Sequence, residues 1–196
     1  LWLGYEHFED RRVDGDGRAT RLAERMAHDV DHDLQSRINA LHLLARSAFV
    51  DEDRWRELHE ATAGFREGFG GEVIVVDAGG RWRLHSRVPV DSDLPPLPKP
   101  AGRSAIDAVF ATARPAVGDP FVGPVAGEPM VAIGVPVRRG SEVPYAFANL
   151  MPVRRLDTLF GDVPLPADWS AAVLDSRGRV IWRRGADGRA PPAGPD

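Results

Sequence analysis

The chain of 196 residues contains no cysteine, a single lysine and no long apolar run. The missing cysteines exclude disulfides, thiolate metal sites and cysteine nucleophiles. No stretch approaches the ~20 apolar residues that cross a bilayer, and none has the pattern of a signal peptide. Arginine and lysine never occur more than twice in succession, so the sequence lacks the concentrated positive charge that binds nucleic acid. We therefore expect no nucleic-acid partner.

The composition itself is ordinary for a globular protein. Hydrophobic residues make up 43% of the chain and charged residues 28%, with a formal net charge of −4. Such a chain forms one large domain or two small ones. The sequence contains no GxSxG, no Walker A motif and no GxGxxG following a strand, which are common signatures of catalytic and nucleotide sites. We therefore expect neither catalysis nor a cofactor.

Residues 19–49 predict one long helix, because no glycine or proline interrupts them and apolar side chains recur about every 3.7 residues. The stripe consists of Leu22, Met26, Val30, Leu34, Ile38, Leu41, Ala45 and Ala48. The opposite face is charged and includes Arg37, which we expect in solvent. A helix of this length spans about 45 Å and would extend past the width of one small domain.

The other segments predict an α+β fold, with a long N-terminal helix packed on an antiparallel sheet of about five strands. A second helix follows residue 50, with Asp51 or Asp53 as its N-cap. The proline-rich residues 93–102 form a loop, and Ser104 caps a short helix. The remaining predicted elements are a hairpin over 73–90, two or three strands within 121–152, a brief helix over 153–160, a hairpin over 171–184 and a polar tail.

Two stretches repeat one pattern: VIVVDAGGRWRLHSR at 73–87 and AAVLDSRGRVIWRR at 171–184. Asp77 and Asp175 each begin an Asp-x-x-Gly-Arg turn. Aspartate can bond the backbone two residues on, and glycine adopts a positive φ at no steric cost. The repeat marks either a second module or a hairpin that is simply common in arginine-rich sequences.

The chain from about Arg18 to Arg184 resembles the PAS-like Cache sensor domains of bacterial transmembrane receptors. It is most similar to the double-Cache ectodomains of sensor histidine kinases. The order of three segments carries the resemblance: LQSRINALHLLARSAFV, VIVVDAGGRWRLHSRVPV and RPAVGDPFVGPVAGEPMVAIGVPVRRGSEVPYAFANL.

The resemblance implies three parts. These are a signalling helix over 1–50, a membrane-distal Cache module over 51–163, and over 164–196 the start of a second module or an exit connector with a disordered tail. It also implies an extracytoplasmic domain, membrane-tethered in the full-length receptor, that binds a small molecule and pairs with a second copy through the long helix. The opening LWLGY fits such a tether, since Trp and Tyr favour the headgroup region, but equally fits an arbitrary start. The alternative is a cytoplasmic PAS- or GAF-like module that acts through protein contacts alone.

Three basic residues of the first hairpin form the core of the predicted ligand site. Strand alternation places Arg83, His85 and Arg87 on one face, with Trp82, Leu84 and Ser86 on the other. In the fold that the resemblance implies, one face of the sheet lines the ligand cavity. Because buried charge needs a partner, this face predicts an organic anion, with Arg87 holding a carboxylate through its planar fork. Alternatively, Arg87 lies in solvent or pairs with Asp91 or Asp93.

Three more residues complete the predicted site. Asp119 lies where a loop enters a strand. If it faces Arg87, the two side chains would together bind the two charges of a zwitterion. Alternatively, Asp119 forms the turn before Pro120. Tyr145 and Asn149 share a strand face and could finish a small-ligand site, although Tyr145 also suits an ordinary core. Amino-acid-binding Cache domains carry a Tyr/Arg/Trp pattern that this sequence does not match, because Trp82 precedes Arg87.

His28 and His32 lie four residues apart on the long helix, a spacing that zinc sites use. No HExxH motif is present, and the sequence offers no obvious third ligand. We therefore expect a solvated helix face here and no metal.

Overall fold

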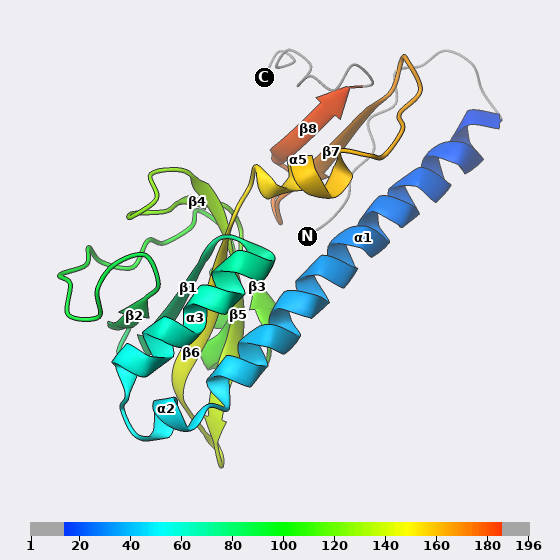
Figure 1. Ribbon diagram of the computed structural model, residues 1–196. Coiled ribbons are helices and arrows are strands. Elements are labelled where there is room, and N and C mark those ends of the chain that lie inside the picture. The colour runs from blue at the N-terminus through cyan, green and yellow to red at the C-terminus, as the bar shows by residue number, and fades with distance from the viewer. Residues whose placement is uncertain (1–13, 186–196) are drawn as a thin grey trace. The chain divides into compact units, whose positions relative to one another are not determined.

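The computed structural model describes residues 14–185, so the predictions for the opening LWLGY and for the tail lie outside the described residues. Contacts divide the described chain into two compact units, one over 34–152 and one that combines 14–33 with 153–185. Helix α1 belongs in part to each (Figure 1). The helices are α1 (Asp14–Ala45), α2 (Ala48–Asp51), α3 (Trp55–Phe69), α4 (Ala105–Thr112) and α5 (Arg155–Phe160). The strands are β1 (Glu72–Asp77), β2 (Trp82–His85), β3 (Ala116–Val117), β4 (Phe121–Val122), β5 (Pro129–Arg139), β6 (Glu142–Pro152), β7 (Ser170–Leu174) and β8 (Val180–Gly185).

The predicted long helix is present but ends before residue 49. α1 stops at Ala45, and the Ser47 hydroxyl then accepts a hydrogen bond from the Phe49 amide at 3.1 Å, which starts the short helix α2. Within the stripe, Met26 and Leu41 are buried. The apolar face of α1 therefore contributes to the core of the chain itself.

The prediction that Arg37 faces solvent is wrong, because its exposure is 0%. Arg37 lies seven residues after Val30 and four before Leu41, positions that share one helix face. Its Nη1 donates a hydrogen bond to Oδ1 of Asn149 in β6 at 2.7 Å. A buried guanidinium requires such partners. The periodicity of the helix sequence cannot show a partner that lies on a distant strand.

The N-cap predicted for the second helix is also wrong. Asp51 ends α2, and Asp53 takes a left-handed backbone with φ 53°. Arg54 occupies the N-cap of α3 without a side-chain cap bond, and its Nε instead pairs with Glu57 at 2.8 Å. By contrast, Ser104 caps α4 as predicted, because its hydroxyl accepts from the Asp107 amide at 3.2 Å.

The unit over 34–152 is built on one antiparallel sheet of six strands, where the sequence predicts about five. Its order is β2-β1-β6-β5-β3, and β4 also pairs with β5. All six residues of β1 are buried between β2 and β6. The predicted α+β class, with a long helix packed on an antiparallel sheet, is confirmed.

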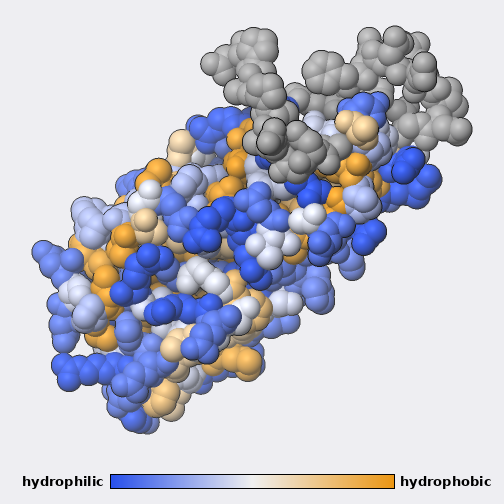
Figure 2. All heavy atoms as spheres, turned by 45° about the horizontal axis from the view of Figure 1, so that its top comes forward, coloured by the Kyte–Doolittle hydropathy of each residue, from blue (hydrophilic) through white to orange (hydrophobic). Residues whose placement is uncertain are grey.

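The two faces of this sheet carry different helices. Residues of α1 and α3 such as Leu41, Leu58 and Phe65 pack with Val75 and Phe147 on one face, called here the α1 face. On the other, the α4 face, Ala105 packs with residues such as Ile74 and Ala132. Figure 2 shows a largely hydrophilic surface with small apolar groups between the polar ones. Among the described residues, the large apolar side chains that are most exposed are Leu43, Val122 and Val180.

In the other unit, α5 packs with the second hairpin, β7–β8. The rings of Phe160 and Trp182 lie 4.9 Å apart, and Trp182 Nε1 donates to Asp157 Oδ1 at 2.7 Å. Arg184 Nη1 donates to the Gly161 carbonyl at 2.8 Å. By its contacts α5 thus belongs with the second hairpin, whereas the predicted boundary at 163/164 placed it in the preceding module. The roles predicted for the three segments 1–50, 51–163 and 164–196 stay predictions.

The two repeated turns have the same hydrogen bonds. In the first, Asp77 Oδ1 accepts from the amides of Gly79 and Arg81, both at 3.0 Å, and Oδ2 accepts from Arg81 Nε at 3.1 Å. The glycine before the arginine, Gly80, has φ 77°. Just before the turn, a β-bulge lies between Val75 and Val76.

The second turn repeats each of these features 98 positions later. Asp175 Oδ1 accepts from the amides of Arg177 and Arg179 at 2.9 Å, and Oδ2 accepts from Arg179 Nε at 2.8 Å. Gly178 has φ 78°, and a bulge again precedes the aspartate. The predicted Asp-x-x-Gly-Arg turn is therefore confirmed in both hairpins.

These turns predict an acid-sensitive contribution to stability. Burial raises the pKa of Asp77, but bonds from the Arg81 amide, the Arg81 guanidinium and the Gly79 amide outweigh it and hold the pKa below its ordinary value. A carboxyl with a depressed folded pKa stabilises the fold above the unfolded pKa of about 4 and loses that contribution as pH falls through the folded value. We expect Asp77→Asn to cost about 1–2 kcal/mol at pH 7 and to flatten the pH dependence of stability below pH ~4.

Urea unfolding between pH 2 and 7 measures this effect. Asp91→Asn is the matched control, because the side chain of Asp91 is 82% exposed and exposed pairs contribute little. If the free energy of unfolding of Asp77→Asn fell with pH below ~4 as steeply as that of the wild type, Asp77 would not be the source of the acid sensitivity.

Candidate ligand-binding site

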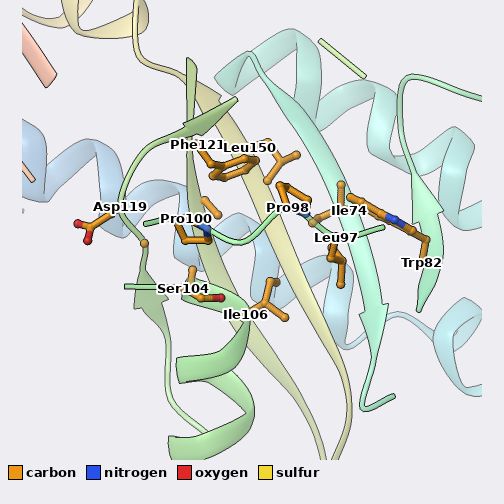
Figure 3. A pocket seen from close by; sticks show the side chains of 13 residues that line it. Ile74, Trp82, Leu97, Pro98, Pro100, Ser104, Ile106, Asp119, Phe121 and Leu150 are labelled. Atoms are coloured by element: carbon orange, nitrogen blue, oxygen red, sulfur yellow. The ribbon is translucent and has the colours of Figure 1, made fainter. Parts of the chain in front are cut away.

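A hollow lies on the α4 face of the sheet (Figure 3). Its empty space, continuous with solvent, is about 360 Å³, of which about 20 Å³ can hold the centre of a water molecule. Strands β1, β2, β5 and β6 contribute to it, together with the start of α4 and part of the proline-rich loop. Its lining is mainly apolar, as expected of small-molecule sites. Its large apolar side chains are Ile74, Trp82, Leu97, Ile106, Phe121 and Leu150.

The loop that walls the hollow is tied to the sheet at both ends. At one end, Trp82 Nε1 donates to the Pro95 carbonyl at 2.7 Å. At the other, Asp119 Oδ2 accepts from the Arg103 amide at 2.7 Å, and the Asp119 amide donates to the Arg103 carbonyl at 2.8 Å. A Cβ on Gly118 would lie 2.9 Å from the Ala105 nitrogen, so only glycine allows this approach. The sequence predicted this segment as a loop, but gave no sign that it forms the wall of a site.

The alternation predicted for β2 is wrong, because a bulge interrupts it. Val75 pairs with Leu84 but Val76 pairs with Trp82, so Arg83 is the extra residue. Trp82 and His85 consequently share the α4 face, where their rings lie 5.6 Å apart.

The three basic residues have other partners instead of a cavity. The Arg83 guanidinium lies 5.3 Å from the centre of the Trp55 ring and 3.9 Å from Asp53 Oδ1. Arg87 Nε contacts Glu72 Oε1, and His85 Nε2 lies 3.1 Å from Glu72 Oε2. None of the three is among the residues that line the hollow.

Glu72 is the residue that the sequence analysis missed. Its carboxylate and the ring of His85 are almost fully buried, with side-chain exposures of 3% and 0%. These are close contacts and not well-aligned hydrogen bonds, since neither Glu72 Oε1 nor His85 Nε2 has a hydrogen-bond partner of good geometry among the described residues. A glutamate that opens an otherwise apolar strand was the signal available, because a buried carboxylate needs a cationic partner.

Tyr145 and Asn149 lie on the α1 face, away from the hollow. The Tyr145 ring packs edge-on against Trp55, with ring centres 5.3 Å apart, which is the ordinary core role. Asn149 is fully buried, and its Nδ2 donates to the carbonyls of Gly70 and Glu72 at 3.3 and 3.1 Å. With Arg37 bound to its Oδ1, the whole amide serves the core.

Of the six predicted site residues, the structure brings only Asp119 to the hollow. Its carboxylate points away from the other lining side chains (Figure 3), toward the loop that it holds. Arg83, His85, Arg87, Tyr145 and Asn149 do not line this hollow, and the ligand roles given to them stay predictions.

Two other expectations concern metals and membranes. His28 and His32 are exposed, and in the described part of the chain no cluster of three or more acidic or histidine residues is placed to hold a metal ion. Of the helices within 14–185, none is both long and apolar enough to span a bilayer.

No protein-family model matches the sequence. No curated protein matches it either. Solved structures do match, among them ligand-binding domains of bacterial chemoreceptors. The domain of the Pseudomonas aeruginosa amino-acid chemoreceptor PctB with L-Arg has a TM-score of 0.69 at 17% identity, covering 87% of this chain and 71% of that one. The domain of Pseudomonas fluorescens CtaA with L-alanine has a TM-score of 0.66 at 12% identity, covering 86% and 71%.

A third match, P. aeruginosa PctC with GABA, has a TM-score of 0.64 at 18% identity and covers 86% of this chain and 76% of that one. At such low identity the likeness shows the fold alone. The chain has the Cache-type fold of chemoreceptor ligand-binding domains. This confirms the predicted fold, in which a long N-terminal helix packs on a PAS-like antiparallel sheet.

Proposed function

We propose that this chain is the extracytoplasmic ligand-sensing domain of a bacterial membrane receptor, with no catalytic activity of its own. A small molecule binds in the hollow between the sheet and the proline-rich loop. The observation that carries the proposal is this hollow, formed by the sheet and α4 of a Cache-type fold. The similar solved domains are described with L-Arg, L-alanine and GABA, which supports a small organic ligand.

The sheet offers a physical route from the ligand to α1. Glu72 connects the two faces, because its side chain contacts His85 beside Trp82, while its carbonyl accepts from Asn149. Asn149 in turn holds Arg37 of α1. A ligand that favours one arrangement of β1 and β6 thereby changes the position of α1 against the sheet, provided that the ligand binds two conformations of the domain with different affinities.

The receptor that carries this domain is, in our proposal, a sensor histidine kinase or a related chemoreceptor, anchored in the membrane. The sequence also predicts a homodimer through the long helix. Since much of the apolar stripe is buried within the chain, a dimer contact on α1 would use its outer side, where Leu43 is 74% exposed.

A thermal-shift screen of the 196-residue chain tests the sensing function. The library contains amino acids, amines, alcohols and carboxylates, and a compound at a hundred times its dissociation constant adds about 2.7 kcal/mol. We expect at least one compound to raise the midpoint, and Ile106→Trp to abolish the rise by filling the hollow. Val180→Trp, at an exposed site in the other unit, is the matched control and should retain it. A screen without hits would favour the module that acts through protein contacts, and hits that survive Ile106→Trp would place the site elsewhere.

A further inference from the structure

The hollow has no cationic lining residue. Asp119 is the sole ionisable side chain among the described residues that line it. Lys99 and Arg103, which adjoin lining residues in sequence, are exposed and do not line it. Arg81, next to Trp82, pairs with Asp77. Arg83 and Arg87 are held by contacts outside it. A carboxylate placed in the hollow would therefore lose water without gaining a charged partner, which is costly.

The start of α4 could in principle supply that partner, because the N-terminus of a helix attracts anions. Here the protein has placed its own carboxylate beside it. Asp119 Oδ2 accepts from the amide of Arg103 at 2.7 Å, and Arg103 directly precedes the N-cap Ser104. Gly118 at the same time packs closely against the Ala105 nitrogen. A second carboxylate at this point would meet the negative charge of Asp119.

The polar side chains of the lining are also already bonded. The Trp82 indole donates to the Pro95 carbonyl at 2.7 Å. The Ser104 hydroxyl oxygen accepts from the Asp107 amide at 3.2 Å, and its O–H can still donate one hydrogen bond, for example to a neutral hydroxyl. A polar ligand group that displaced these bonds would leave protein groups unpaired. The remaining surface, from Ile74, Leu97 and Phe121, suits hydrocarbon.

We infer that the hollow binds a small neutral or cationic molecule with an apolar body, and that it rejects molecules with a free carboxylate. The inference rests on the proposed sensing function and specifies its ligand class. It replaces the organic anion predicted from the sequence, which depended on Arg83, His85 and Arg87 facing a cavity. It also separates this chain from the similar domains described with L-Arg, L-alanine and GABA, each of which is a molecule with a carboxylate.

Matched pairs of probes test the inference on the 196-residue chain. Benzyl alcohol is compared with benzoate, 3-methylbutanol with 3-methylbutanoate, and L-leucinol with L-leucine. Dissociation constants come from thermal shift and calorimetry, in wild type and in Ile106→Trp. We expect at least one neutral or cationic probe to bind, its carboxylate partner to bind at least about 30-fold more weakly, and Ile106→Trp to abolish binding.

Asp119→Asn provides an independent arm, because the amide oxygen can still accept from the Arg103 amide while the charge is lost. We expect the preference for benzyl alcohol over benzoate to shrink by about tenfold in this variant. An unchanged preference would refute the role given to Asp119.

The outcomes distinguish the two proposals. Carboxylates that bind as well as their partners, and that are lost in Ile106→Trp, would overturn the inference and leave the sensing function intact. If no probe of any pair binds, the inference is overturned, and the broad screen alone then decides the sensing function.

Discussion

Replacing Asn149 with alanine is expected to lower the free energy of unfolding by about 3 kcal/mol or more. The variant removes the acceptor of the buried Arg37 guanidinium and the donor to the Gly70 and Glu72 carbonyls. Each of these buried groups then loses one hydrogen bond that offsets its loss of water. Urea unfolding followed by tryptophan fluorescence measures the change.

The cost should depend on Arg37, because the substitution removes one hydrogen-bond acceptor from a buried charge. We expect Asn149→Ala to lower the free energy of unfolding by less when Arg37→Met is already present. The loss in the double variant should be smaller than the sum of the two single losses by at least about 1 kcal/mol. Gln35→Met is the control. Its side chain is exposed on the same helix and bonds Asn39, and we expect a change within about 0.5 kcal/mol. Additive single effects would show that the two side chains are not coupled.

Gly71→Ala is expected to be comparably severe, with a loss of at least about 3 kcal/mol. Gly71 has φ +80°, and a Cβ there would lie 2.3 Å from the Leu150 carbonyl oxygen and 3.0 Å from Asn149 Nδ2. The first of these atoms is backbone in the centre of the sheet and cannot turn aside. The start of β1 and the C-terminal end of β6 would have to separate.

Gly68→Ala is the matched control for that substitution. Gly68 lies near the end of α3 with nothing within 4 Å of its added Cβ. Alanine favours a helix over glycine, so this variant should gain about 0.5–1 kcal/mol. Thermal and urea unfolding of both variants supply the comparison, and a Gly71→Ala protein as stable as wild type would mean that β1 and β6 are not held as closely as the structure has them.

Features that depend on neighbours in sequence could be predicted from the sequence. The turns at Asp77 and Asp175 use bonds within five residues, and the Ser104 cap uses a bond three residues on. Because such bonds form wherever the local backbone allows, residue type and spacing are sufficient. The order of helices and strands follows from the same kind of information.

Features that depend on residues far away in the sequence could not be predicted from it. Arg37 is buried because Asn149, 112 positions away, accepts its hydrogen bond. The bulge at Arg83 moves Trp82 to the face of His85, and strict alternation cannot show a residue inserted into a ladder. The first hairpin contributes Ile74 and Trp82 to the hollow, whereas its basic residues do not line it. Part of the lining comes from a loop whose position is set by contacts with Trp82 and Asp119.

The central place of β1 in the sheet has a consequence for how the protein folds. β1 lies between β2 and β6, yet β6 begins 65 positions after β1 ends. At roughly 5–20 residues per second, a growing chain displays the run VIVV with one open edge for about 3–13 s before β6 can cover it. Such a segment is prone to pair with other chains, and only the charges of Glu72 and Asp77 at its two ends oppose this. We therefore expect slower synthesis between these strands to lower the yield of soluble protein.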